Sequence, residues 1–209
     1  MKGRTGRWVF ASGNAGKFSE LKALLAPTGI VLVARNEFGL ASPQETGRTF
    51  LENALLKARH AAAATGLPAV ADDSGLAVDA LDGAPGVRSA RFADGGGSRA
   101  NIAKLLELMK DVPDPDRGAR FCCVVVALTR WDDPMPLVGS GQWHGYIARE
   151  PCGESGFGYD PVFFDPRLGA TAAELPAEVK NRVSHRRQAL AQIEKALRDQ
   201  AVGEQAGSD

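Results

Sequence analysis

The feature that most constrains this chain is a short apolar run that ends in two adjacent carboxylates. Residues 67–71 read as a buried strand, and Asp72 and Asp73 follow directly, before Ser74 and Gly75. Side chains alternate along an extended strand, so one aspartate can face a binding site while the other braces the turn. Gly75 permits a sharp exit that would lift the pair to the end of a sheet, where α/β proteins bind ligands. An ordinary polar turn is the alternative, because Asp-Asp-Ser-Gly also suits one.

Strand and helix patterns alternate in the first half of the chain, and hairpin patterns dominate the second half. The predicted elements are, in order, a strand at residues 8–11, a helix at 18–25, a strand at 30–33, a helix at 50–65 that opens on a capping box, the strand at 67–71, a short strand at 76–80 that pairs back on it, a helix at 98–110, a long strand at 119–129, its hairpin partner at 137–149, a short strand at 162–164 and a helix from Ser184 to about residue 198. This order predicts an α/β fold with a mixed sheet, in one domain of two lobes over residues 1–202. Residues 203–209 read as a disordered tail.

Charge and cysteine content narrow the class of protein. The 209 residues carry 25 basic and 25 acidic side chains, a balance that gives no support to a nucleic-acid or membrane-surface role. The three cysteines form neither a disulfide framework nor a metal-ligand pattern, which suits a reducing compartment. No stretch fits a signal peptide or a membrane span. We therefore expect a cytoplasmic protein whose anion chemistry comes from local clusters.

One such cluster is the loop of residues 12–17, Ser-Gly-Asn-Ala-Gly-Lys, between a predicted strand and a predicted helix. Backbone N–H groups at a helix start, together with one lysine, suit a chain of phosphates. The loop lacks the spacing of a Walker P-loop, and Phe18 stands where the metal-binding hydroxyl would be. A Walker-type kinase or ATPase is therefore disfavoured, and an ordinary strand-to-helix turn remains the alternative.

An acidic set, Glu45 with Asp72 and Asp73, suggests a metal site. Without a P-loop hydroxyl, Mg²⁺ needs carboxylates, usually one or two together with substrate phosphate oxygens. Glu45 lies in a polar loop long enough to reach the end of the central strand. A solvated loop charge is the alternative for Glu45.

Two further stretches break local rules. The predicted last helix begins with His185, Arg186 and Arg187, although the partial positive charge of a helix start favours acidic residues. Such a violation points to an anionic or electron-rich partner, with a basic surface patch as the alternative. Phe157 stands between two glycines, so its ring can be held on an open backbone and stack on a base. A core phenylalanine is the alternative there.

Taken in order, these stretches resemble the family of inosine/xanthosine triphosphate pyrophosphatases, which remove deaminated purine nucleotides from the nucleotide pool. The matching stretches are residues 12–17, 45–47 with 52–54, 71–76, 83–87 with 89–92, 156–161 and 184–186. No functional position departs from the family pattern. Ser12 stands where many members have threonine, and the hydroxyl is kept.

The resemblance implies an elongated mixed central sheet flanked by helices, with two lobes and a nucleotide cleft between them. It implies a homodimer that hydrolyses ITP, dITP and XTP to the monophosphate and pyrophosphate with Mg²⁺. Asp73 looks like the catalytic acid/base residue and a metal ligand, and Glu45 like a second metal ligand. The implied substrate contacts are Ser12, Gly13, Asn14, Ala15, Gly16, Lys17, Ser74, Phe157, Gly158, Tyr159, Asp160, Lys180, His185 and Arg186.

The residues alone leave two other functions open. One is a phosphohydrolase that releases single phosphates, and the other is a non-catalytic nucleotide-binding module. The intact acidic set argues against a pure binder. For base selection, we expect His185 and Arg186 to donate to the six-position oxygen of hypoxanthine or xanthine, which would disfavour adenine.

Overall fold

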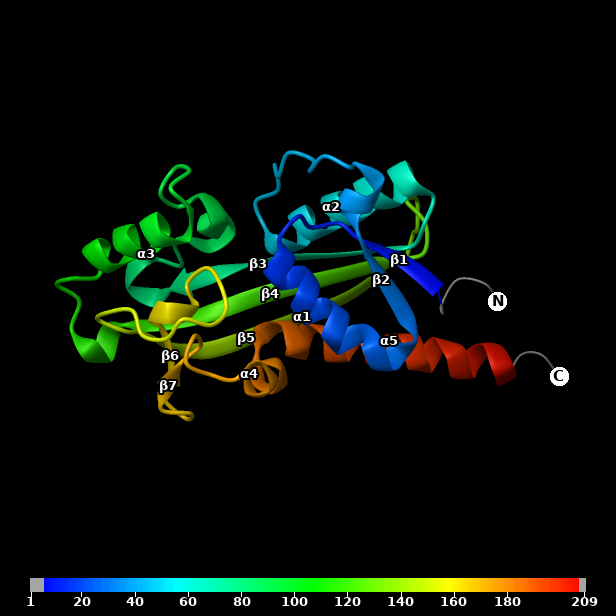
Figure 1. The fold of residues 1–209 in the computed structure, drawn as a ribbon. Helices are drawn as coiled ribbons and strands as arrows, with labels where there is room; N and C mark the ends of the chain where they lie inside the picture. Colours follow the sequence, from blue (N-terminus) through cyan, green and yellow to red (C-terminus); the bar gives the residue numbers. More distant parts are fainter. Residues whose placement is uncertain (1–5, 207–209) are drawn as a thin grey trace. The chain divides into compact units, whose positions relative to one another are not determined.

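The computed structural model describes residues 6–206 and contains a seven-stranded mixed sheet flanked by helices (Figure 1). The strand order is β2-β1-β3-β4-β5-β6-β7. The strands are β1 (Gly6–Phe10), β2 (Ile30–Ala34), β3 (Ala69–Val78), β4 (Gly118–Leu128), β5 (Leu137–Ile147), β6 (Phe163–Asp165) and β7 (Ala170–Thr171). The α-helices are α1 (Ala15–Leu25), α2 (Phe50–Thr65), α3 (Gly97–Leu108), α4 (Ala177–Val183) and α5 (His185–Ala206). Strand β1 pairs in parallel with β2 and β3, whereas β6 pairs antiparallel with β5 and β7, so the predicted mixed α/β sheet is confirmed.

The chain divides into two compact units. Unit 1 contains residues 1–73, 123–141 and 186–209, and unit 2 contains residues 74–122 and 142–185. Residues 1–5 and 207–209 lie outside the described residues. The expected tail at 203–209 therefore falls partly there, and α5 extends to Ala206.

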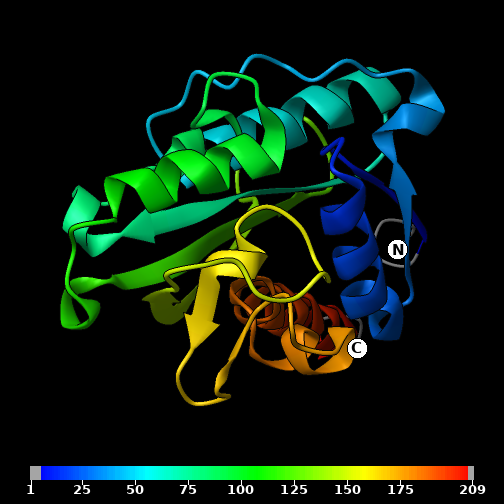
Figure 2. The same cartoon turned by 60° about the vertical axis from the view of Figure 1, so that its left-hand side comes forward.

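Unit 1 has helices on both faces of its strands (Figure 2). On one face, α1 and α5 pack against the aromatic residues Trp8 and Phe10 of β1. On the other face, α2 packs through a row of alanines that includes Ala54 and Ala58. The small alanine side chains let α2 approach the sheet closely, and the same face of α2 also carries the buried polar residues Asn53 and Lys57.

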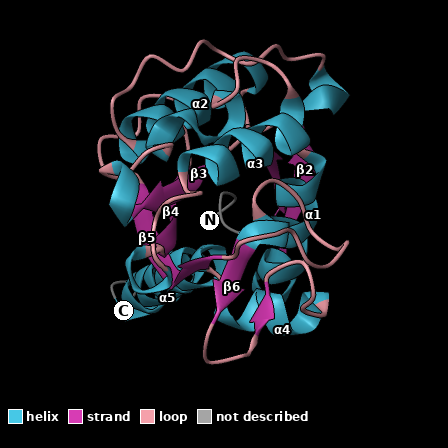
Figure 3. Ribbon diagram, turned by 90° about the vertical axis from the view of Figure 1, so that its left-hand side faces the viewer, coloured by secondary structure: helices cyan, strands magenta, loops and turns pink. Residues whose placement is uncertain are grey.

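Unit 2 has a core of larger side chains. Leu105 and Met109, at the end of α3, pack in one cluster with Trp143 of β5 and Phe163 of β6. The Trp143 indole N–H donates to Asp165 Oδ2 at 2.7 Å, so the ring is fixed in the core. Figure 3 labels helix α4 and the short strand β6, both of which belong to unit 2. Neither α4 nor β7 was predicted, because both are short and carry little periodic signal.

The central strand differs from its prediction. The expected turn after residue 71 is wrong, because β3 continues through both aspartates to Val78. Gly75 does not provide a sharp exit. Its missing Cβ instead admits a neighbouring segment, since a Cβ there would lie 2.4 Å from both the Gly86 carbonyl oxygen and Ser89 Oγ. Ser89 Oγ in turn accepts a hydrogen bond from the Leu76 N–H at 2.9 Å.

Helix ends follow local chemistry closely. The predicted capping box of α2 is confirmed, because Thr49 Oγ1 accepts from the Glu52 N–H and the Glu52 carboxylate accepts from the Thr49 N–H. Gly66 ends that helix in the left-handed conformation, also as predicted. Helix α1 begins three residues before the expected Phe18, because Asn14 caps it. Apolar periodicity did not detect this first turn, which contains no large apolar residue.

Candidate functional site

The loop of residues 12–17 follows β1 and ends in the first turn of α1. Asn14 Oδ1 accepts a hydrogen bond from the Lys17 N–H at 3.0 Å, and Ser12 Oγ accepts one from the Asn14 N–H at 3.3 Å. The N–H groups of Ala15 and Gly16 lie in the first turn of α1, where the helix itself provides no acceptor. No other described residue accepts a hydrogen bond from them. The loop can therefore offer backbone donors to an anion.

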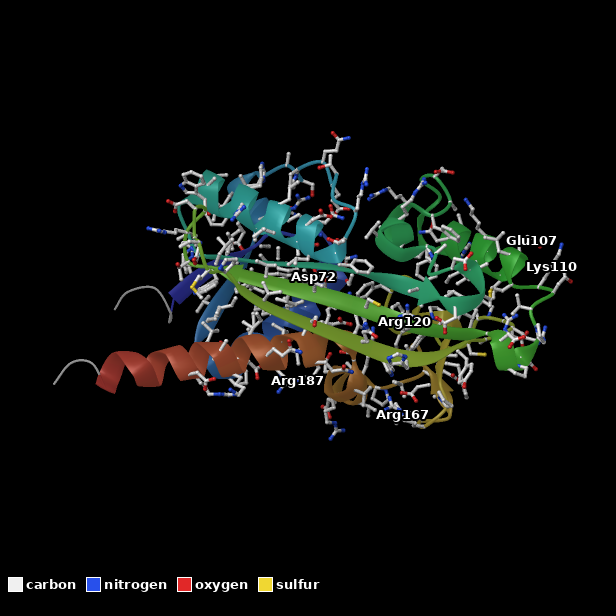
Figure 4. The ribbon with its side chains drawn as sticks, turned by 180° about the vertical axis from the view of Figure 1, so that it is seen from behind. Asp72, Glu107, Lys110, Arg120, Arg167 and Arg187 are labelled. Atoms are coloured by element: carbon white, nitrogen blue, oxygen red, sulfur yellow. The ribbon has the colours of Figure 1, made fainter. Side chains whose placement is uncertain are left out.

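Asp72 lies on the α1 and α5 side of the sheet. Figure 4 labels Asp72 on β3. The residue is completely buried, and its Oδ2 lies 2.9 Å from Lys17 Nζ and 3.4 Å from Arg186 Nε. Burial by itself would raise the pKa of Asp72, but Lys17 and Arg186 outweigh burial and hold the pKa below its ordinary value. Asp72 is thus ionised near neutral pH and pairs with two cations.

Arg186 is held by carboxylates rather than left as an open donor. Its Nη1 donates to Glu20 Oε2 at 2.6 Å, in addition to its contact with Asp72, and the residue is buried. This explains the basic start of α5, since the charge is compensated by α1 and β3 rather than by the helix's own first turn. Arg187 pairs with Glu194 of the same helix at 2.7 Å (Figure 4).

Asp73 has a different set of partners, as strand alternation predicts. Its Oδ1 lies 2.7 Å from Lys57 Nζ, and its Oδ2 accepts from Asn53 Nδ2 at 3.3 Å. Both partners come from α2, on the other face of the sheet from α1. Burial raises the pKa of Asp73 above its ordinary value, and the attraction of Lys57 offsets this only in part. The neighbouring aspartates therefore differ chemically: the pKa of Asp72 is lowered by its two cations, and the pKa of Asp73 is raised by burial.

Lys57 connects Asp73 to the predicted second metal ligand. Its ammonium also lies 3.1 Å from Glu45 Oε1, and the Lys57 side chain is only 6% exposed. Burial alone would lower the pKa of Lys57, but the surrounding carboxylates raise it above the ordinary value. Our sequence reasoning did not single out Lys57. The signal was present, because Lys57 and Asn53 fall in the same inward stripe of α2 as its buried alanines.

The loop that bears Glu45 is fixed to α2 through Gly47. The Gly47 N–H donates to Asn53 Oδ1 at 2.8 Å, and Asn53 Nδ2 donates back to the Gly47 carbonyl at 3.4 Å. A Cβ on Gly47 would lie 2.6 Å from Asn53 Oδ1, so the contact requires glycine. Asn53 therefore positions Asp73 and the Glu45 loop together.

Glu45 and Asp73 fit a hard divalent cation. Their carboxylates converge on the buried ammonium of Lys57, which shows that the site accepts positive charge. Among residues 6–199, no group of three or more His, Cys, Asp or Glu side chains is arranged to hold a metal. Two carboxylates nevertheless suffice for Mg²⁺ when substrate phosphates complete the shell. Glu45 and Asp73 therefore stay predicted metal ligands, with a donor set that would need substrate oxygens to complete it.

The remaining predicted contacts lie in unit 2. Asp160 is buried, and its Oδ2 accepts from Lys180 Nζ at 2.6 Å and from the Phe157 N–H at 2.8 Å. Lys180 Nζ also lies 5.0 Å from the centre of the Phe157 ring, a cation–π contact. Phe157 is therefore half-buried rather than fully exposed. The Tyr159 hydroxyl donates to the Ser89 carbonyl at 2.9 Å, and burial raises its pKa.

The predicted site residues thus form two sets. Residues 12–17, Glu45, Asp73 and Arg186 belong to unit 1, whereas Ser74, residues 157–160, Lys180 and His185 belong to unit 2. Within unit 2, the His185 ring stacks on Phe121 with their centres 4.9 Å apart. Among the described residues, no helix has the length and apolar character needed to cross a membrane.

Comparison with known proteins identifies the family of this chain. The model of the Ham1 family matches residues 8–196. This chain belongs to the Ham1 family. The resemblance inferred from the motifs is therefore confirmed.

Relatives of this Ham1-family chain cover nearly its whole length. It is 58% identical over 192 residues to a dITP/XTP pyrophosphatase of Shigella flexneri, covering 91% of this chain and 98% of that protein. It is 56% identical over 190 residues to a dITP/XTP pyrophosphatase of Xylella fastidiosa, covering 90% and 96%. The structure of a HAM1 protein from Coxiella burnetii matches with a TM-score of 0.84 at 47% identity, covering 93% of this chain and 99% of that one.

Proposed function

We propose that this Ham1-family chain hydrolyses deaminated purine nucleoside triphosphates, such as dITP, ITP and XTP, to the monophosphate and pyrophosphate. The relatives named dITP/XTP pyrophosphatase support this substrate class. One structural observation carries the reaction type: two carboxylates converge on a buried cation in the same unit as a donor-rich helix start.

Asp73 is the residue we assign to the chemistry. Hydrolysis between the α- and β-phosphates requires a water to attack the α-phosphorus and lose a proton. The raised pKa of Asp73 suits a proton acceptor, and its carboxylate is equally suited to bind the metal. A Mg²⁺ ion held by Glu45 and Asp73 would neutralise phosphate charge and make a bound water more acidic. Asn53 keeps the Asp73 carboxylate oriented through its amide.

We assign the leaving pyrophosphate to the 12–17 loop. The N–H groups of its first helical turn and the Lys17 ammonium can stabilise the charge that develops on the departing group. Lys17 is already oriented, because Asp72 holds its ammonium at 2.9 Å. We assign base and sugar contacts to Ser74, residues 157–160 and Lys180, and the recognition of a six-position oxygen to His185. The same role for Arg186 stays a prediction, because its Nη1 already donates to Glu20.

The reaction is tested by incubating the protein with ITP and MgCl₂ and separating the products by ion-exchange chromatography. We expect IMP and pyrophosphate in equal amounts. Asp73→Asn should lower turnover by about a hundred-fold or more while the protein remains folded, because it removes the carboxylate charge that we propose to accept the proton and to bind the metal. Asp79→Asn, the same change at a carboxylate paired with Arg120, is the matched control. IDP with inorganic phosphate, or no turnover at all, would refute the proposal.

We further propose a cytoplasmic homodimer, as the family resemblance implies. Light scattering coupled to size-exclusion chromatography measures the mass directly. A mass of 22.1 kDa at micromolar concentration, equal to that of one chain, would contradict the dimer.

A further inference from the structure

Arg35 is a cation beside the phosphate loop that neither the motifs nor the assigned site accounts for. It directly follows β2, whose last residue, Ala34, pairs in register with Phe10 at the end of β1. The 12–17 loop leaves the sheet from that end of β1. Arg35 and the loop therefore meet at the carboxyl ends of two parallel neighbouring strands, where α/β sheets bind ligands.

The guanidinium lies directly against Gly13. A Cβ built on Gly13 would be 2.5 Å from Arg35 Nη2, 3.1 Å from Nε and 3.2 Å from Cζ. The guanidinium thus occupies the space that a side chain at residue 13 would need. The absence of a Cβ at Gly13 is what lets the positive charge approach the loop backbone.

Arg35 lacks a counter-charge in the described part of the chain. No carboxylate of the described residues lies within ion-pair distance of it, in contrast to Arg186, which has two such partners. Its Nη1 donates to the Ser42 hydroxyl, while its buried Nε has no hydrogen-bond partner among the described residues. A partly buried guanidinium without a counter-charge is costly unless a bound anion neutralises it.

We propose that Arg35 binds the pyrophosphate portion of the nucleotide, as a second cation of the 12–17 loop in addition to Lys17. This inference rests on the proposed function, because it takes that loop as the phosphate site. The planar guanidinium suits phosphate oxygens, to which it can donate two parallel hydrogen bonds. Arg35 also donates to Ser42, which lies in the loop that bears Glu45. Arg35 would thereby link the position of that loop to phosphate binding at the 12–17 loop.

The test compares pyrophosphate with IMP as competing ligands, because only pyrophosphate would contact Arg35. For Arg35→Gln, we expect the inhibition constant of pyrophosphate and the KM for ITP each to rise about ten-fold or more, as for loss of a charge-assisted contact. The inhibition constant of IMP should stay within about two-fold of wild type. Arg35→Lys should recover part of the pyrophosphate affinity, since it keeps the charge but not the paired donors. Arg130→Gln, which removes an arginine charge from the β4–β5 turn, is the control for net charge.

The outcomes separate this inference from the proposed function. Wild-type protein that neither releases nor binds pyrophosphate would refute both. Wild-type protein that binds pyrophosphate, with an unchanged inhibition constant in Arg35→Gln, would refute the role of Arg35 alone. An equal weakening of IMP and pyrophosphate, together with a lower melting temperature, would show that Arg35 only supports the fold and would also overturn the inference.

Discussion

Replacing Lys57 with methionine removes one charge while keeping an unbranched side chain of similar length. In the native protein the ammonium lies 2.7 Å from Asp73 Oδ1 and 3.1 Å from Glu45 Oε1. The Lys57 and Asp73 side chains are 6% and 8% exposed, so water cannot replace the lost cation. The substitution would leave two carboxylates facing each other with no positive charge between them.

The expected cost follows from that burial. Removing one partner of a buried ion pair destabilises a protein by about 3–5 kcal/mol, because the remaining charge stays desolvated. Glu45 is 28% exposed and is partly screened, so we expect a loss of about 3 kcal/mol for Lys57→Met. The carboxylates raise the pKa of Lys57 above its ordinary value of 10.5, so the ammonium contributes fully at every pH below that value. Lys57 itself therefore stays charged from about pH 6 to pH 9, and any narrowing of the difference from wild type toward low pH would come from protonation of Asp73, whose pKa burial raises.

Urea unfolding of Lys57→Met and wild type, each with EDTA and with excess MgCl₂, measures this cost. A divalent cation that binds the freed carboxylates should restore about 2.7 kcal/mol at a hundred times its dissociation constant. Lys110→Met makes the same change at an exposed pair with Glu107, and it should cost little because water screens that pair. An equal, small loss in both variants would refute the reasoning, since it would mean that the Lys57 pair is not desolvated.

Three other changes have defined outcomes. Asp72→Asn should make the free energy of unfolding fall less steeply between pH 5 and pH 2 than in wild type. The pKa of Asp72 lies below its ordinary 3.8, so its stabilising contribution is present above that pH and is lost as pH falls further. Urea unfolding at each pH measures this, and the same change of unfolding free energy with pH in both proteins would contradict it. Gly75→Ala should lower stability by about 1–3 kcal/mol in thermal unfolding, because the new Cβ would lie 2.4 Å from the Gly86 carbonyl oxygen; an unchanged melting temperature would show that the segment can move aside. Arg117→Met should lower stability by about 2 kcal/mol or more, since this buried guanidinium donates to four backbone carbonyls, and native hydrogen-exchange protection in the variant would argue against that role.

Local chemistry was sufficient to place several features of this protein. The Thr49–Glu52 capping box and Gly66 set both ends of α2, because capping depends on a few neighbouring residues and not on distant contacts. Strand alternation separated Asp72 from Asp73, because successive side chains of any strand point to opposite faces. The family could be inferred for a similar reason, because an ordered set of short motifs is a property of the sequence and needs no knowledge of distant contacts.

Contacts between segments distant in sequence decided the rest. Asp-Asp-Ser-Gly continues as strand, and the segment at Gly86 occupies the space that a Cβ on Gly75 would need, a contact that local sequence does not reveal. Lys57 became part of the site only when α2 packed on the sheet and carried its ammonium to Asp73. Packing then gave the two aspartates opposite pKa shifts, although they are chemically identical and adjacent, because Lys17 and Arg186 outweigh burial at Asp72 whereas burial prevails at Asp73. Desolvation and the direction of neighbouring charges are properties of the packed chain, so a residue's identity and local pattern cannot supply them.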